Sequence, residues 1–131
     1  MPTPLEIVNK FLDLTNEKKD ISAAAELLTD DVKFVGPAQQ ASGKAEYIQL
    51  LTMFLPAHAG WKVYQQFETE SDASVIEDIL CKTPAGDIIT LSLAEWFKVS
   101  GGKIAEHRVY YDPSEFMRAF GLAAPPTTPQ Q

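Results

Sequence analysis

The sequence predicts an α+β domain in which helices come first and antiparallel strands follow. Before Pro56, apolar residues recur at helical spacing behind clear helix-start signals, whereas from Trp61 onward the pattern alternates at every second residue, as in strands. Helices followed by a run of strands indicate α+β rather than alternating βαβ units. A curved sheet closing over three amphipathic helices would leave a pocket, and such pockets hold small, mostly apolar molecules.

The first helix has the clearest start signal. Thr3 is a good N-cap, Pro4 suits the first helical position, and Glu6 completes a capping box, so a helix is expected from there to about Glu17. Further helices are expected from Asp20 or Ser22 to Leu28, from Lys44 to Leu55, and in a short final stretch over 116–120.

The strands are expected to form a meander after one short early strand. That early strand covers 32–35, and a polar loop reaching Ser42 follows it. The later strands are expected over 61–67, 75–82, 89–99 and 103–111, joined by three successive hairpins.

Composition limits the classes of function. With 131 residues and 45% hydrophobic content the chain is expected to form one globular domain over 1–122, followed by a disordered proline-rich tail over 123–131. A net charge of −7 without a basic run argues against nucleic acid as a partner. The single cysteine, the absence of signal-peptide features and the absence of a long apolar run favour a cytoplasmic protein away from membranes.

One acid lies within the apolar row of a predicted strand. Glu95 shares its face with Leu93 and Phe97, and on the next strand His107 lies on the less polar face. A three-residue loop at Ser100-Gly101-Gly102 places Glu95 directly across from His107, whereas a two-residue loop would put Arg108 there. The three-residue loop is preferred because it matches the more apolar faces of both strands.

Glu95 and His107 are therefore the first candidates for chemistry. An inward titratable pair costs several kcal/mol unless it is partnered or borders a cavity, and perturbed buried acids favour functional sites. A carboxylate held only for structure is the alternative. Asp78 is a third candidate, although either Asp78 or its neighbour Glu77 must point outward and be merely solvated.

The remaining candidates would line a pocket or have no chemical role. The two histidines lie far apart in the sequence and have no carboxylates at metal-ligand spacing, so no metal site is expected. The sequence also has no glycine-rich phosphate loop, so no cofactor is expected. Packing in the core is the simpler explanation for most inward aromatic residues. The residues expected to contact a ligand are Phe11, Tyr47, Trp61, Phe97, Val109 and Tyr111.

Three strings of the sequence resemble one known family. LLTDDVKFVGP, GKAEYI and above all EWFKVSGGKIAEHRVYYDPSEFMRAFG are similar to the SnoaL-like branch of the nuclear transport factor 2 superfamily, over roughly Pro4 to Leu122. The resemblance implies a cone-shaped α+β fold, with a curved and mostly antiparallel sheet wrapped around three N-terminal helices and a short C-terminal helix. Members include polyketide cyclases, ketosteroid isomerases, limonene epoxide hydrolases, dehydratases and binding proteins, so the fold constrains function weakly.

Residue-by-residue transfer removes two of these activities. The ketosteroid isomerase positions fall at Phe11, near Val35 and Gly36, and at Glu95, and only the last carries a carboxyl group. The limonene epoxide hydrolase positions fall at Ile76, Asp78 and Val109, which break that triad. Cyclases of the SnoaL type need one acid or base, and Glu95, His107 or Asp78 could serve.

Two functions are consistent with these features. One is a cofactor-free enzyme of the cyclase, isomerase or dehydratase type, acting on a small apolar substrate by acid/base catalysis. The other is a non-catalytic ligand-binding or dimerisation domain. In either case Trp96 and Tyr110 would project from the outer face of the sheet, which together with the family habit predicts a homodimer packed sheet to sheet.

Overall fold

The structure is a computed structural model that describes residues 2–122. The predicted tail over 123–131 lies outside the described residues. No helix of the described part is long and apolar enough to cross a membrane. The helical elements are α1 (Pro4–Leu12), the π-helical turn η1 (Asp13–Glu17), α2 (Ile21–Ala25), α3 (Lys44–Phe54), the 3₁₀ turn η2 (Leu55–Ala57) and α4 (Ser114–Ala119).

Six strands form one curved sheet in the order β2-β1-β6-β5-β4-β3. The expected meander is confirmed as β3 to β6, each strand pairing antiparallel with the next. The early part of the sheet differs from the prediction. β1 already begins at Leu28, which was expected to end the second helix, β2 lies where a loop was expected, and β1 pairs with β6 in parallel. The strands are β1 (Leu28–Val35), β2 (Gln40–Ser42), β3 (His58–Glu68), β4 (Asp72–Lys82), β5 (Ile88–Ser100) and β6 (Lys103–Tyr110).

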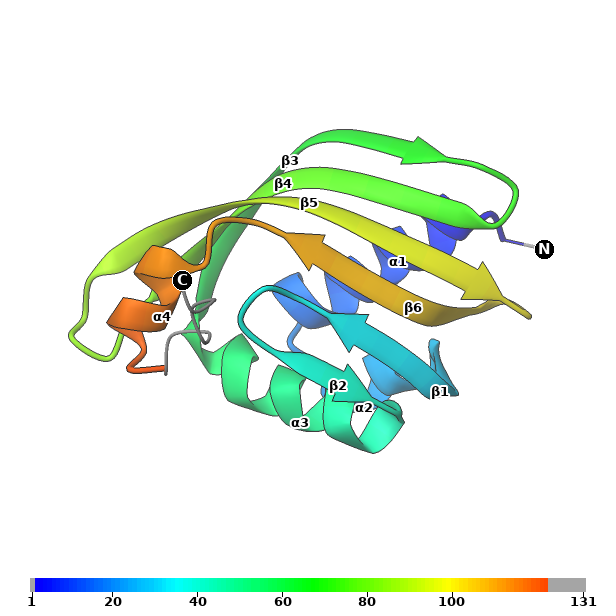
Figure 1. Ribbon diagram of the computed structural model, residues 1–131. Helices are drawn as coiled ribbons and strands as arrows, with labels where there is room; N and C mark the ends of the chain where they lie inside the picture. Colours follow the sequence, from blue (N-terminus) through cyan, green and yellow to red (C-terminus); the bar gives the residue numbers. More distant parts are fainter. Residues whose placement is uncertain (1, 123–131) are drawn as a thin grey trace, which may run out of the picture.

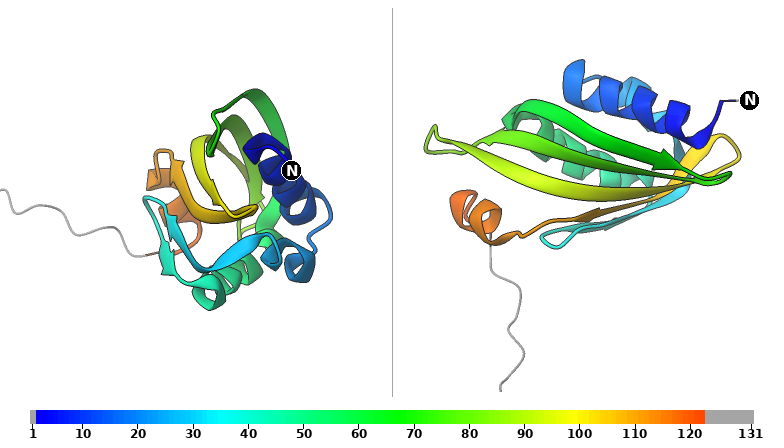
Figure 2. Two further views of the ribbon diagram at one scale, coloured as in Figure 1. Left: turned by 90° about the vertical axis from the view of Figure 1, so that its right-hand side faces the viewer. Right: turned by 90° about the horizontal axis from the view of Figure 1, so that it is seen from above.

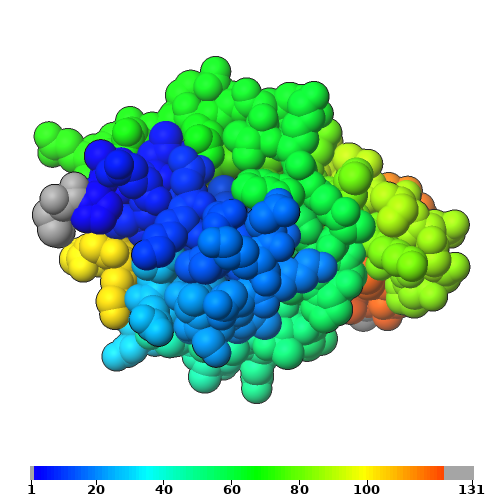
Figure 3. Space-filling model, turned by 180° about the vertical axis from the view of Figure 1, so that it is seen from behind, coloured from blue at the N-terminus to red at the C-terminus, as the bar shows by residue number. Residues whose placement is uncertain are grey.

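The helices cover the concave side of this sheet. α1 packs on β3 and β4, and α3 packs on β1 and β2 (Figure 1). Seen end-on, the sheet curls around the space between these two helices (Figure 2). From behind, α1 and α2 in blue lie across the molecule beside α3 in green (Figure 3). The short helix α4 packs against β5.

The start of α1 forms as its sequence predicts. The Thr3 hydroxyl accepts from the backbone N–H of Glu6, and the Glu6 carboxylate accepts from the backbone N–H of Thr3, which completes the capping box. The helix continues to Glu17 as expected, but its last turn is π-helical over Asp13–Glu17. One-turn π segments often occur at functional sites, and this one borders the cavity described below.

The register of the β5–β6 hairpin differs from the prediction. Ser100 pairs with Lys103, so the loop has two residues, Gly101 and Gly102, both with positive φ. A bulge after the Val99–Ile104 pair then shifts the register, so that Glu95 lies opposite Val109. The cause is Ile104, which is fully buried and faces inward although a strict alternation would place it outside.

The bulge keeps the predicted inward faces despite this error. His107 pairs with Phe97, one step diagonal to Glu95 on the same face. Diagonal neighbours on one face of a sheet remain within reach of long side chains. Glu95 and His107 are therefore in contact without being directly opposite each other.

Candidate functional site

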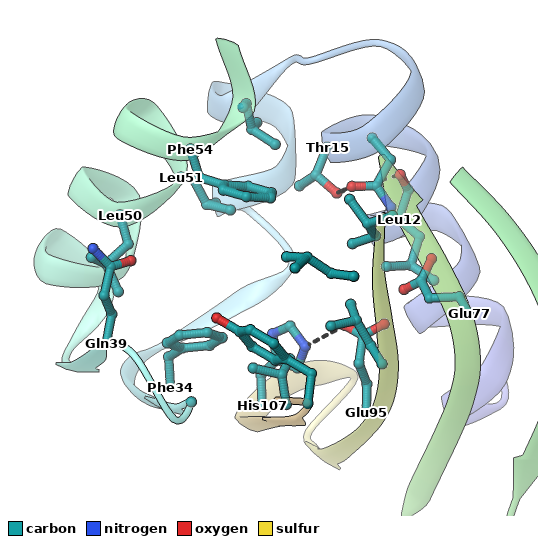
Figure 4. A pocket seen from close by; sticks show the side chains of 18 of the residues that line it. Leu12, Thr15, Phe34, Gln39, Leu50, Leu51, Phe54, Glu77, Glu95 and His107 are labelled. Atoms are coloured by element: carbon teal, nitrogen blue, oxygen red, sulfur yellow. Dashed lines mark hydrogen bonds and ion pairs between the residues drawn. The ribbon is translucent and has the colours of Figure 1, made fainter. Parts of the chain in front are cut away.

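A cavity of about 120 Å³ lies between the concave face of the sheet and the helices. Leu12, Leu50, Leu51 and Phe54 line it from α1 and α3 (Figure 4), and the strands supply its opposite wall. The lining is predominantly apolar, with only a few polar groups. A concave apolar pocket with a few converging polar groups is the usual form of a small-molecule site.

Three polar side chains form a hydrogen-bonded chain at the wall of this cavity. Tyr47 from α3 contacts His107 Nδ1 through its hydroxyl, and His107 Nε2 lies 2.8 Å from Glu95 Oε1. All three side chains are buried, and all three line the cavity. Figure 4 shows the bond between His107 and Glu95.

His107 is a neutral imidazole fixed between aromatic rings. Phe97 stacks on it with ring centroids 4.0 Å apart, and Phe34 meets it edge-on at 5.2 Å. Burial lowers the pKa of His107 to about 3, while burial and the charge of Glu95 raise the pKa of Tyr47. We therefore assign the proton of Tyr47 to the bond with Nδ1 and the imidazole proton to Nε2, which donates to Glu95.

Both ring nitrogens of His107 are thus occupied within the protein. Its role in this arrangement is to orient Glu95 rather than to meet a ligand. Glu95 Oε2, by contrast, is buried and receives no hydrogen bond from any residue of the described part. This oxygen therefore remains able to exchange a proton with a bound molecule.

A second buried acid, Glu77, lies beside Glu95. It comes from β4, where Val75 pairs with Glu95, so the two carboxyl groups are diagonal neighbours on the inner face. Glu77 is only 1% exposed, and neither of its oxygens has a hydrogen-bond donor within residues 2–122. Figure 4 shows both acids at the cavity.

The two carboxyl groups cannot both be ionised at low energetic cost. Burial raises the pKa of Glu77, and the neighbouring carboxyl group of Glu95 raises it further. Burial also raises the pKa of Glu95, partly offset by the neighbouring carboxyl group of Glu77. A proton held by Glu77 keeps the pair at a single negative charge, as adjoining carboxyls elsewhere share one proton.

The structure brings most of the predicted site residues together and separates three from them. Asp78 lies on the outer face, where its carboxylate accepts from Tyr64 and Ser92. Trp61 lies away from the cavity and donates to Glu17 at 3.0 Å, and Phe97 is buried behind His107. The predicted residues that line the cavity are Glu95, His107, Phe11, Tyr47, Val109 and Tyr111.

The cavity also includes polar residues that sequence reasoning did not select. Glu77 is the most important, because of its two unpaired oxygens. The π-helical turn adds Thr15 and Asn16, and the Asn16 amide nitrogen is buried without an acceptor in the described structure. Within residues 2–122, no three His, Cys, Asp or Glu side chains are grouped so that they could hold a metal ion.

The fold and the cavity define this chain as an α+β pocket protein with a curved sheet closed by helices. A family model of the SnoaL-like domain matches residues 8–107. The chain therefore belongs to the family of SnoaL-like domains. Among curated proteins, no sequence matches it significantly.

Solved structures with the nuclear transport factor 2-like fold resemble it over most of their length. A candidate SnoaL-like polyketide cyclase from Mesorhizobium loti is 24% identical with a TM-score of 0.68, covering 84% of this chain and 100% of that chain. A candidate polyketide cyclase from Pseudomonas putida is 18% identical with a TM-score of 0.74, covering 92% and 99%. A protein with a ketosteroid isomerase-like fold from Catenulispora acidiphila, in complex with trimethylamine, is 16% identical with a TM-score of 0.73, covering 97% and 100%. At these identities the likeness establishes the fold alone.

Proposed function

We propose that the protein is a cofactor-free enzyme of the cyclase, isomerase or dehydratase type, in which Glu95 transfers a proton to and from a small, mostly apolar substrate. The observation that carries this proposal is the buried chain Tyr47–His107–Glu95, which ends on one unpaired carboxyl oxygen at an apolar cavity. The trimethylamine complex of the Catenulispora relative supports a small-molecule occupant.

The chemistry assigned to Glu95 is general base and then general acid. In its carboxylate form it takes a proton from one atom of the substrate, and as the resulting acid it returns that proton to another atom or to a leaving hydroxyl. Proton balance is thus kept within the site without a second reactant. His107 and Tyr47 are positioning residues, since they hold Glu95 in one orientation through bonds that the substrate need not touch.

A ligand-binding domain without turnover is the second candidate. One observation favours it: the hydrogen-bonding groups of His107 are satisfied by the protein itself, as in a polar network kept for structural order. In that case the cavity would hold a molecule and leave it unchanged.

The test begins with the protein taken directly from cells. Native mass spectrometry should detect a co-purified molecule, which is then incubated with the wild-type protein and with Glu95→Gln. We expect the wild type to convert it and Glu95→Gln to be slower by roughly 10²–10⁴-fold with similar affinity, because the amide keeps the shape and loses the basicity.

Asp78→Asn is the matched control. It removes a carboxylate from the neighbouring strand on the outer face and should leave turnover unchanged. A bound molecule that the wild type leaves chemically intact would instead support the binding domain.

A further inference from the structure

The cavity holds two buried acids and no fixed cation to neutralise them. No lysine or arginine is among its lining residues in the described part of the chain. The titratable groups that face Glu77 and Glu95 across the cavity are Tyr47, His107 and Tyr111, none of which supplies a positive charge at neutral pH.

Glu77 differs from Glu95 in having no partner that orients it. Glu95 receives the imidazole of His107, whereas both oxygens of Glu77 are buried and receive no donor from residues 2–122. A carboxyl group that is 1% exposed, lines a cavity and is unpaired on both oxygens is suited to a ligand that brings its own donor.

The rest of the wall suits the apolar part of a cation. Aromatic faces attract ammonium groups, and the cavity is lined by Phe11, Phe34, Phe54, Tyr111 and Phe116. The net charge of −7 also favours the approach of a cation over that of an anion.

We infer that the occupant of this cavity is a small apolar amine in its protonated form, whose ammonium group is anchored by Glu77. The inference rests on the cavity being the substrate site proposed above. The ammonium takes the place of the proton that Glu77 otherwise holds. That proton leaves to solvent, so Glu77 becomes a carboxylate paired with the ammonium. Glu95, which is already a carboxylate, stays free to act as the base.

The test compares two probes of equal size, isobutylamine and isobutanol, by titration calorimetry on the full chain. The wild type should bind the amine at least roughly tenfold more tightly than the alcohol, since a charge-assisted bond to a buried carboxylate is the stronger kind. In Glu77→Gln the preference should fall to within about threefold, which corresponds to about 0.65 kcal/mol. Asp78→Asn, which removes the same charge from the outer face, should keep the wild-type preference.

The dependence on pH provides a second measurement that needs no variant. Because binding releases the shared proton, the affinity for isobutylamine should rise with pH by up to about tenfold per unit while the pair still holds that proton. The affinity for isobutanol should stay constant. The same release should appear as a dependence of the binding heat on the ionisation enthalpy of the buffer.

Several results would overturn the inference. They are equal affinity of the wild type for both probes, no binding of either at millimolar concentration, and an amine preference that survives in Glu77→Gln or is independent of pH. These outcomes are separate from those of the catalytic proposal, since they concern binding without turnover. A preference for the amine without any conversion would contradict only the proposal that the protein is an enzyme. Conversion of a neutral molecule without a preference for the amine would contradict only the proposal that Glu77 binds an ammonium group.

Discussion

Two kinds of buried residue make stability depend on pH in opposite directions. Burial raises the pKa of Glu77 above its ordinary 4.5, so the folded state keeps a proton that the unfolded chain loses. Burial lowers the pKa of His107 from 6.5 to about 3 and that of His58 from 6.5 to about 4. Below pH 6.5 the unfolded chain therefore binds protons that the folded state does not. Stability from the acid is present below pH 4.5 and is lost as the pH rises; stability from the histidines is present above pH 6.5 and is lost as the pH falls.

Between these two values the two histidines outweigh the one proton held by the acid pair. We therefore expect the free energy of unfolding to rise with pH up to about 6.5 and to decrease above it. Above pH 6.5 the decrease should approach about 1.4 kcal/mol per pH unit for each proton that the acid pair retains. Urea denaturation of the wild type and of Glu77→Gln at pH 6.5 and 8.5 measures this. The variant should lose most of the alkaline decrease, and an unchanged decrease would show that Glu77 is not the group that holds the proton.

The inward direction of Glu95 and His107 could be predicted because the residues around them alternate clearly between apolar and polar. The direction of Glu77 could not. Both faces of β4 carry apolar and acidic residues, with Glu77 beside Val75 and Ile79 and Asp78 beside Ile76 and Leu80. Only the packing of β4 against α1 decides which face of the strand points inward. The sequence alone therefore favoured Asp78 as the candidate, although Glu77 is the acid that faces the cavity.

At the scale of elements, local signals were sufficient for the helices and insufficient for the sheet. The capping box of α1 involves residues three apart in sequence, so it is readable from the chain alone. The pairing of β1 with β6 joins residues some seventy positions apart, as in Phe34 with His107, and no local pattern encodes it. The bulge in β6 is likewise decided by the burial of Ile104 rather than by turn residues.

The bulge predicts that truncating the Ile104 side chain strongly lowers the free energy of unfolding. This side chain is fully buried and is the reason why the strand departs from regular pairing. Ile104→Ala should lower the free energy of unfolding by about 2–5 kcal/mol, as for other buried isoleucines.

Ile88→Ala is the control for this change, because the same residue type is 53% exposed at the start of β5. It should stay within about 0.5 kcal/mol of the wild type. Urea denaturation measures both variants, and equal costs at the two positions would contradict the role given to Ile104.

At the scale of the whole molecule, the outer face of the sheet offers an apolar surface for a second copy. Ile76, Ala94 and Tyr110 pair across β4, β5 and β6 and so form one row on this face, with Tyr110 57% exposed. Trp96 lies in the next position along β5, half-buried, and donates to Asp72 at 3.0 Å. This row adds Ile76 and Ala94 to Trp96 and Tyr110, the two residues expected at a dimer interface. An exposed apolar row of this kind favours a homodimer through this face.

We expect the sedimentation mass at micromolar concentration to be twice that of the 14.5 kDa chain. Tyr110→Arg should shift the equilibrium toward the monomer by at least roughly tenfold in dissociation constant, because it places a charge in the desolvated centre of the interface. Met53→Arg is the control, since Met53 is 69% exposed on α3 away from the sheet. A wild-type mass equal to one chain would rule out the dimer.

The central claim is that Glu95 exchanges a proton with the molecule in the cavity, and deuterium transfer tests it most directly. The co-purified molecule is incubated in heavy water with the wild type or with Glu95→Gln, and its mass is followed over time. The account predicts that carbon-bound deuterium appears in the substrate or product with the wild type, and at least roughly 100-fold more slowly with Glu95→Gln. Absence of deuterium with the wild type, or equal rates with both proteins, would contradict it.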